Sequence, residues 1–184
     1  MHLVLENIDI WLTVPDGTGR AAERAAVASL VSEALGHGVA LSHRPDGSPT
    51  VDVPGMHISV SHCRGCAAIA LARVPVGIDV ETYRERQLAR VAPRVLSEQE
   101  IVYYEDNTVG AWTLKEALYK AALTPGLDFR RDIHLPLDGS KSATVMTPEA
   151  TRFRIVASQH LEAFGCYMSV VVRDLASMPI LTTY

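Results

Sequence analysis

The sequence lacks long apolar runs, and it has few cysteines. No stretch of about 18 consecutive apolar residues occurs, so we expect no membrane-spanning helix. The three cysteines, an odd number in a chain of 184 residues, do not suggest a disulfide framework. The opening residues MHLVLENIDIWLTV have no basic segment before the apolar ones, which favours a strand over a signal peptide. We therefore expect a protein of the reducing cytoplasm.

The sequence also lacks an excess of basic residues. Its 17 Lys and Arg stand against 21 Asp and Glu, and the net charge of −4 makes general nucleic-acid binding unfavourable. The segment YRERQLARVAPR departs from this balance, with four arginines against one acid. Arg86 and Arg90 would share one face of a helix that Pro93 interrupts. The segment is either a solvated basic surface or a docking patch for an acidic partner.

What is present is enough apolar residues, 48% of the chain, for one sizeable core or two small lobes sharing one. Strands are predicted at 2–14, 56–62, 66–74, 76–81, 152–158 and 165–173, and helices at 20–36, 97–104 and 111–123. The segments CAAIALAR and CYMSVVVR share their length and end residues, which suggests two related halves. The predicted fold class is α+β in two similar lobes, residues 1–74 and 75–184.

Two groups of charged residues carry the chemistry. Asp79 and Glu81 end the apolar run VGIDVE and project from the same face of a strand, where they either hold a metal or mark an exposed strand end. In the helix 111–123, Glu116 and Lys120 lie on one stripe, a spacing that ordinary surface ion pairs also show. The combination is more informative than either group: G-I-D-x-E is followed about thirty residues later by W-x-x-K-E-x-x-x-K.

These motifs resemble the 4′-phosphopantetheinyl transferases. VGIDVE and WTLKEALYK match the two-part signature of that family, and HISVSHCRGCAAIALA is similar to the strand upstream of it in the larger, surfactin-synthetase-activator type. The resemblance implies transfer of the 4′-phosphopantetheine arm of coenzyme A to a serine of an apo acyl, polyketide or peptidyl carrier protein, with release of adenosine 3′,5′-bisphosphate. It further implies two lobes related by a pseudo-twofold axis, each an antiparallel sheet packed with a helix. One site between the lobes makes a monomer the expected state.

The same matching implies a role for each charged residue. Asp79, Glu81 and Glu116 would hold Mg²⁺ or Mn²⁺, since hard oxygen ligands suit these ions. Lys120 would stabilise charge on the leaving group, and Glu116 would act as base for the carrier serine, directly or through a metal-bound water. Asp79, Glu116 and Lys120 are thus the expected catalytic residues.

A further set is implied to contact coenzyme A. Its members are Arg44, Ser61, His62, Lys115, Lys120 and Arg24. The chain departs from the family pattern in RPDGSP, where Ser48 stands at a position that is commonly Lys or Arg. Arg44 would then carry more of the nucleotide's 3′-phosphate. The first lobe is also shorter than in typical two-lobed members.

Other interpretations are open. Cys63 and Cys66 have the C-x-x-C spacing beside His62, which a zinc or redox protein would use, although zinc sites commonly have two such pairs. A homologue that binds carrier proteins without catalysis would keep the fold. Under the transferase hypothesis, Arg84, Arg86 and Arg90 would dock the carrier protein, which serves fatty-acid, polyketide or nonribosomal-peptide synthesis.

Overall fold

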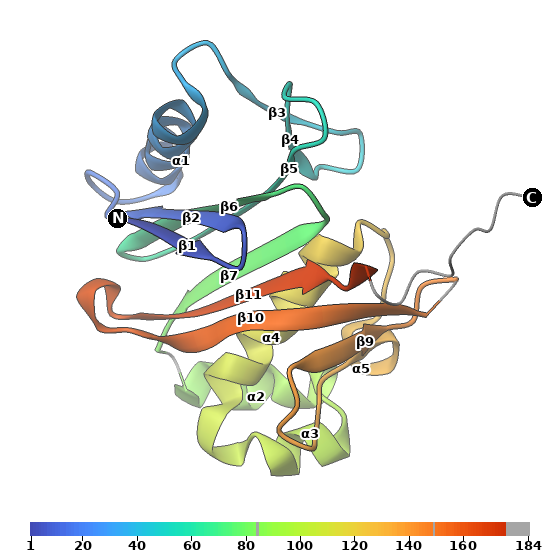
Figure 1. Cartoon of the computed structure of the whole chain (residues 1–184). Helices are drawn as coiled ribbons and strands as arrows, with labels where there is room; N and C mark the ends of the chain where they lie inside the picture. The colour runs from blue at the N-terminus through green and yellow to red at the C-terminus, as the bar shows by residue number, and fades with distance from the viewer. Residues whose placement is uncertain (84, 149, 176–184) are drawn as a thin grey trace, which may run out of the picture.

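The protein is a stack of four layers, helix on sheet on sheet on helices. The computed structural model describes residues 1–83, 85–148 and 150–175, and of the side chains of residues 85, 86 and 89 nothing is described. In Figure 1, α1 (Arg20–Leu35) covers the upper sheet and α4 (Thr108–Ala122) covers the far face of the lower sheet. This arrangement confirms the predicted α+β class.

The upper sheet is antiparallel with the order β1-β2-β6-β5. Its strands are β1 (His2–Leu5), β2 (Ile8–Thr13), β5 (His57–Cys63) and β6 (Cys66–Ala72). The prediction of one strand over 2–14 is wrong, because Glu6 and Asn7 adopt positive φ angles and turn the chain into a hairpin. A small separate hairpin, β3 (Leu41–His43) with β4 (Pro49–Val51), stands beside β5.

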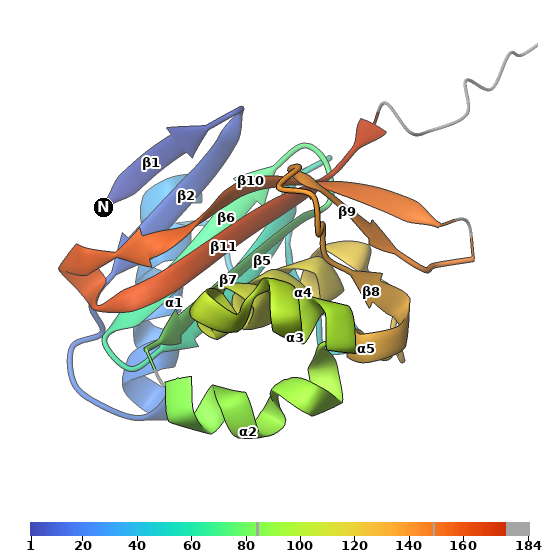
Figure 2. The same ribbon diagram turned by 90° about the horizontal axis from the view of Figure 1, so that it is seen from below.

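The lower sheet is antiparallel with the order β7-β11-β10-β9-β8. Its strands are β7 (Val76–Thr82), β8 (Ile133–His134), β9 (Ser142–Val145), β10 (Thr151–Leu161) and β11 (Cys166–Arg173). The remaining elements are α2 (Glu85–Val95), α3 (Glu98–Tyr103), η1 (Glu105–Asn107), α5 (Phe129–Asp132) and η2 (Glu162–Phe164). Helices α2 to α5 gather on the side of this sheet that faces away from α1 (Figure 2).

The two sheets repeat one order of elements. In each sheet a strand is followed along the chain by a helix and then by a hairpin: β2, α1 and β5–β6 in the upper sheet, and β7, α4 and β10–β11 in the lower sheet. In both sheets the last strand of the hairpin lies between the first two strands, so β6 lies between β2 and β5, and β11 lies between β7 and β10. The similar segments 66–73 and 166–173 correspond to β6 and β11. Both strands are buried on both faces, which explains their apolar character. The pseudo-twofold axis and the lobe boundary after residue 74 stay predictions.

Helix α2 differs from its prediction. Pro93 lies inside the helix instead of ending it. The last turn is held because Ala92 and Leu96, on either side of the proline, are buried in the cluster that includes α4. Arg90 and Arg94 are exposed, whereas Arg84 lies outside the described residues and Arg86 is described only by its backbone.

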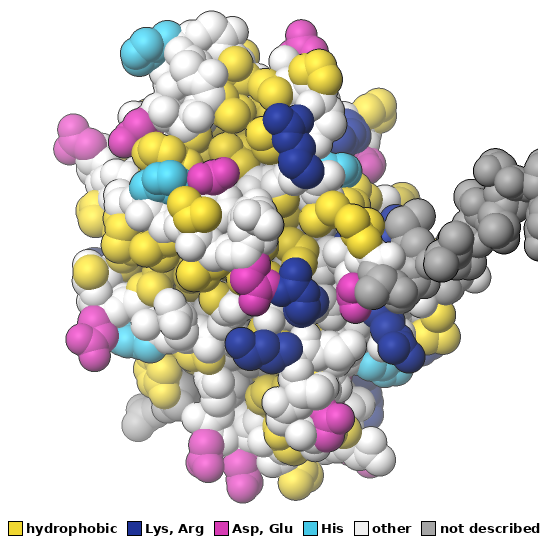
Figure 3. All heavy atoms as spheres, viewed as in Figure 1, with side chains coloured by type: hydrophobic (Ala, Val, Ile, Leu, Met, Phe, Trp, Pro, Cys, Tyr) yellow, Lys and Arg dark blue, Asp and Glu magenta, His cyan; other side chains and the backbone are white. Residues whose placement is uncertain are grey.

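The face of the molecule drawn in Figure 3 carries both positive and negative side chains. On the face in Figure 3, Lys and Arg side chains are scattered among acidic and hydrophobic ones. No helix in the described part of the chain is long and apolar enough to span a membrane.

Candidate functional site

The site begins where α4 crosses β7 at very close range. A Cβ atom on Gly77 would lie 1.9 Å from the carbonyl oxygen of Ala117 and 3.1 Å from the Cβ of Ala121. Only glycine leaves room for this approach. It brings Glu116 and Lys120 of the helix to Asp79, two residues further along the strand. The glycine of the G-I-D-x-E motif therefore has a packing role that the sequence analysis did not assign.

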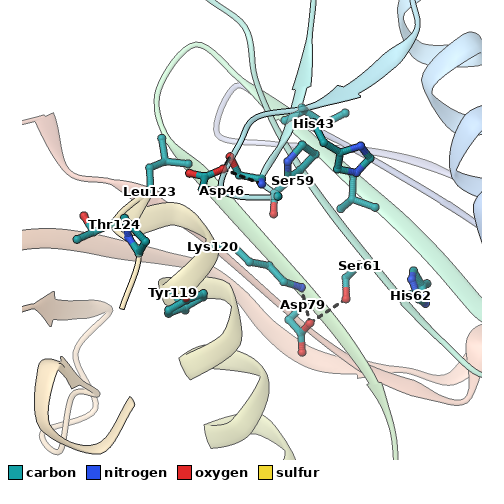
Figure 4. Close-up of a pocket in the computed structure, with 16 residues that line it drawn as sticks. His43, Asp46, Ser59, Ser61, His62, Asp79, Tyr119, Lys120, Leu123 and Thr124 are labelled. Carbon is teal, nitrogen blue, oxygen red and sulfur yellow. Dashed lines mark hydrogen bonds and ion pairs between the residues drawn. The ribbon is translucent and has the colours of Figure 1, made fainter. Parts of the chain in front are cut away.

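Asp79 is the centre of the site. It is 6% exposed, and its Oδ1 accepts hydrogen bonds from Lys120 Nζ at 2.7 Å and from Ser61 Oγ at 2.8 Å. The two donors approach from α4 and β5 (Figure 4). Lys120 also donates to the backbone carbonyl of Ile78 at 3.1 Å. Burial raises the pKa of Asp79, and this effect outweighs the opposing one of Lys120 and Ser61.

Glu116 and Glu81 lie beside Asp79 and are half-buried. Burial, followed by the negative charges of Asp79 and Glu81, raises the pKa of Glu116, while Lys120 opposes the shift. One oxygen of Glu81 accepts from the backbone N–H and the hydroxyl of Thr82, at 3.0 and 3.2 Å. A cation placed beside Asp79 and Glu116 would favour their charged forms, against the effect of burial.

The chemistry of this donor set fits a divalent cation. Carboxylate oxygens are the hard ligands that Mg²⁺ prefers, and a positive ion would favour the charged forms of Asp79, Glu81 and Glu116 together. Within residues 1–83, 85–148 and 150–175, however, no three His, Cys, Asp or Glu side chains already form a group that could hold a metal. For all three carboxylates to bind one ion, at least one of them must therefore turn.

Asp79 and Lys120 form part of the wall of a cleft of about 550 Å³. The other walls come from the turn between β3 and β4, from β5, and from the end of α4 with the residues that follow it. This volume is in the range of sites that bind small molecules and cofactors. Tyr119, Thr124 and His43 also line the cleft, although the sequence analysis singled out none of them as a site residue.

The residues implied to contact coenzyme A are placed unevenly. Ser61, His62 and Lys120 line the cleft. Arg44 belongs to the turn that forms one wall, but its guanidinium donates within that turn, to Ser48 Oγ at 3.2 Å and to the carbonyl of Pro49 at 3.3 Å.

The next two side chains are Arg24 and Glu23 of α1. Arg24 is exposed and is not among the residues that line the cleft. Its neighbour Glu23 reaches His62, with 3.2 Å between Oε2 and Nδ1. Glu23, which the sequence analysis did not consider, therefore orients the histidine at the cleft.

Lys115 does not reach the cleft, and the expectation that it contacts coenzyme A needs correction. Its ammonium is fully buried, pairs with Glu100 at 2.8 Å, and donates to the carbonyls of Phe129 and Ile133. Burial lowers the pKa of Lys115, against the effect of Glu100. These three bonds use all three N–H donors of the ammonium. The lysine ties α4 to α3 and α5, a structural role.

The three cysteines are free, buried and close together where β5, β6 and β11 meet. Contact with the Cys166 thiol, followed by burial, raises the pKa of Cys63. A thiol that resists deprotonation is a poor zinc ligand and a poor nucleophile. The C-x-x-C spacing has a structural explanation, because Cys63 and Cys66 are cross-strand partners in the hairpin of β5 and β6.

The comparison with known families identifies the chain. Residues 75–171 match the family model described as the 4′-phosphopantetheinyl transferase superfamily. The chain belongs to this superfamily. No curated protein matches it.

The matched region runs from the link before β7 to within β11, so it includes α4 and the three carboxylates Asp79, Glu81 and Glu116 of this superfamily member. The β3–β4 turn and β5, which form the opposite wall of the cleft, lie outside the match. The surfactin-synthetase-activator subtype stays a prediction.

Proposed function

We propose that the protein transfers the 4′-phosphopantetheine group of coenzyme A to a serine of an apo carrier protein and releases adenosine 3′,5′-bisphosphate. The observation that carries the proposal is the Asp79–Lys120 pair on the wall of a cleft, with Glu116 and Glu81 at its side. A lysine beside buried carboxyl groups suits a substrate that brings both phosphate charge and a cation. Membership of the superfamily supports the same reaction.

Each residue has a task in this reaction. The serine oxygen bonds to the phosphorus that carries the pantetheine, and the bond from that phosphorus to the bridging oxygen of the pyrophosphate breaks. Lys120, which is partly exposed at the cleft, would stabilise the negative charge left on the nucleotide. Glu116 would accept the serine proton, and in the ion-free protein burial and the neighbouring carboxylates raise its pKa, which makes it a stronger base than an exposed glutamate.

We assign the metal site to Asp79, Glu81 and Glu116, with Mg²⁺ as the ion and Mn²⁺ as a substitute. When bound, the ion supplies positive charge that neutralises the pyrophosphate. Without an ion, Lys120 is the counter-ion of Asp79 at 2.7 Å.

We place the carrier protein at α2, where Arg90 is exposed, and we propose that Arg84 and Arg86 of the same basic segment contribute to docking. Carrier proteins of fatty-acid, polyketide or peptide synthesis are the candidate partners. We further propose a cytoplasmic monomer of the holo-carrier-protein synthase kind, with a pseudo-twofold axis between lobes 1–74 and 75–184, since one chain already forms both walls of the cleft.

Intact-mass spectrometry tests the reaction directly. Apo carrier protein is incubated with the protein, coenzyme A and Mg²⁺, and a parallel sample contains EDTA. We expect a gain of one phosphopantetheine that EDTA abolishes, and we expect Glu116→Gln to abolish it while carrier binding is retained. Coenzyme A binding without transfer to any of several carriers would favour the non-catalytic carrier-binding homologue. Failure to bind coenzyme A at all would contradict the proposal.

A further inference from the structure

Two serines of β5 hold the open edge of β7. The Ser59 hydroxyl accepts the backbone N–H of Ile78 at 3.0 Å, and the Ser61 hydroxyl accepts that of Val80 at 3.1 Å. Both serines are buried, at 2% and 6% exposure. β7 pairs with β11 on its other side, so these N–H groups would otherwise be buried without an acceptor. The alternation S-V-S in HISVSH matches the alternation of N–H groups along β7.

The two serines differ in one bond. Ser61 also donates its hydroxyl hydrogen to Asp79 Oδ1 at 2.8 Å, and Ser59 has no such carboxylate partner among the described residues. A hydroxyl has one hydrogen to donate. With that hydrogen directed at Asp79, Ser61 has none for a phosphate of coenzyme A.

We propose that Ser61 is a positioning residue for Asp79, and that it sets the carboxylate for metal binding instead of contacting coenzyme A. The inference rests on the proposed function, which assigns Asp79 to the metal. Ser61 and Lys120 both donate to Oδ1, which fixes the rotation of the carboxyl group. No donor from the described residues reaches Oδ2, so the same arrangement leaves this oxygen for a cation. Outer hydrogen bonds of this kind strengthen metal binding by about 10- to 100-fold.

Ser59→Ala is the matched control for Ser61→Ala. Each change removes one bond to a β7 N–H from the same strand, so the two should lower thermal stability alike. Only Ser61→Ala removes the bond to Asp79. Ser61→Cys keeps the size of the side chain with a much weaker donor, and Ser61→Thr keeps the hydroxyl. These variants keep the comparison possible if one of them fails to fold.

The measurement is Mn²⁺ binding to the full chain by electron paramagnetic resonance, with and without coenzyme A, and coenzyme A binding by calorimetry. We expect Ser61→Ala and Ser61→Cys to weaken Mn²⁺ binding about tenfold or more, Ser61→Thr to restore most of it, and Ser59→Ala to change it less than about twofold. Coenzyme A affinity without metal should stay within about twofold throughout.

Three results would overturn the inference. Equal losses of Mn²⁺ affinity in Ser59→Ala and Ser61→Ala would show that Ser61, like Ser59, only holds β7 in place. Unchanged Mn²⁺ binding with weaker coenzyme A binding in Ser61→Ala would return the serine to a substrate contact. If the unchanged protein binds no Mn²⁺ under either condition, the assigned metal site itself fails, and this result is separate from the first two.

Discussion

Replacement of Gly77 by alanine should disturb the whole site through one methyl group. The new Cβ would lie 1.9 Å from the carbonyl oxygen and 2.8 Å from the carbonyl carbon of Ala117. Both atoms belong to the backbone of α4, so no side-chain rotation relieves the overlap. Either the helix or the strand must move.

The size of the effect follows from that distance. An ordinary carbon–oxygen contact is about 3.3 Å, so α4 must withdraw by about 1.4 Å. Overpacking of this kind costs about 1–3 kcal/mol of the free energy of unfolding. For a chain of this length, a loss of about 2 kcal/mol lowers Tm by about 4–8 °C. Moving Glu116 and Lys120 away from Asp79 by about 1 Å should also reduce transfer about 100-fold.

Thermal unfolding and the carrier-modification assay measure the two effects on one sample. Gly38→Ala is the control, because a Cβ at Gly38 meets no atom within 4 Å and this glycine does not need a positive φ. We expect the control to keep its Tm within about 1–2 °C and its full activity. If Gly77→Ala shows the same Tm and rate as the control, the close approach of α4 to β7 does not position the site.

Three further predictions concern other residues. Lys115→Met should lower the free energy of unfolding by about 3–5 kcal/mol in urea titration, because Glu100 stays buried without its cation; normal stability with a raised KM for coenzyme A would instead restore the substrate contact. In EDTA, the free energy of unfolding should fall as pH rises above the ordinary glutamate pKa of 4.5, because folded Glu116 holds its proton more tightly than Glu116 of the unfolded chain. Glu116→Gln should remove this part of the pH dependence. An identical pH dependence in the variant contradicts the raised pKa. Arg90→Glu should weaken carrier binding at low salt, and less so at high salt, in surface plasmon resonance; equal affinity would make α2 a plain solvated surface.

Sequence patterns predicted those parts of the fold that depend on local spacing. The helix predicted at 97–104 is present as α3, because the capping box formed by Ser97 and Glu100 needs only hydrogen bonds within four residues. The strand at 2–14 was predicted without its turn, because Glu6 and Asn7 form a hairpin without the usual Asn-Gly or Asp-Gly signal. Strands β8 and β9 were not predicted, since their short segments acquire strand structure only by pairing with each other and with β10.

By itself, the sequence determined the family and the charged residues of the site, because motifs and i, i+4 spacing are properties of the chain. It also placed Glu116 and Lys120 on one side of one helix. Only the tertiary structure decided how the charges are used. Lys115 and Lys120 belong to one motif, yet one is paired with buried Glu100 and the other with Asp79 at the cleft. These partners, Glu100 and Asp79, come from different elements of the fold. What each lysine does therefore depends on its burial and on its partner from a distant segment, and not on its residue type.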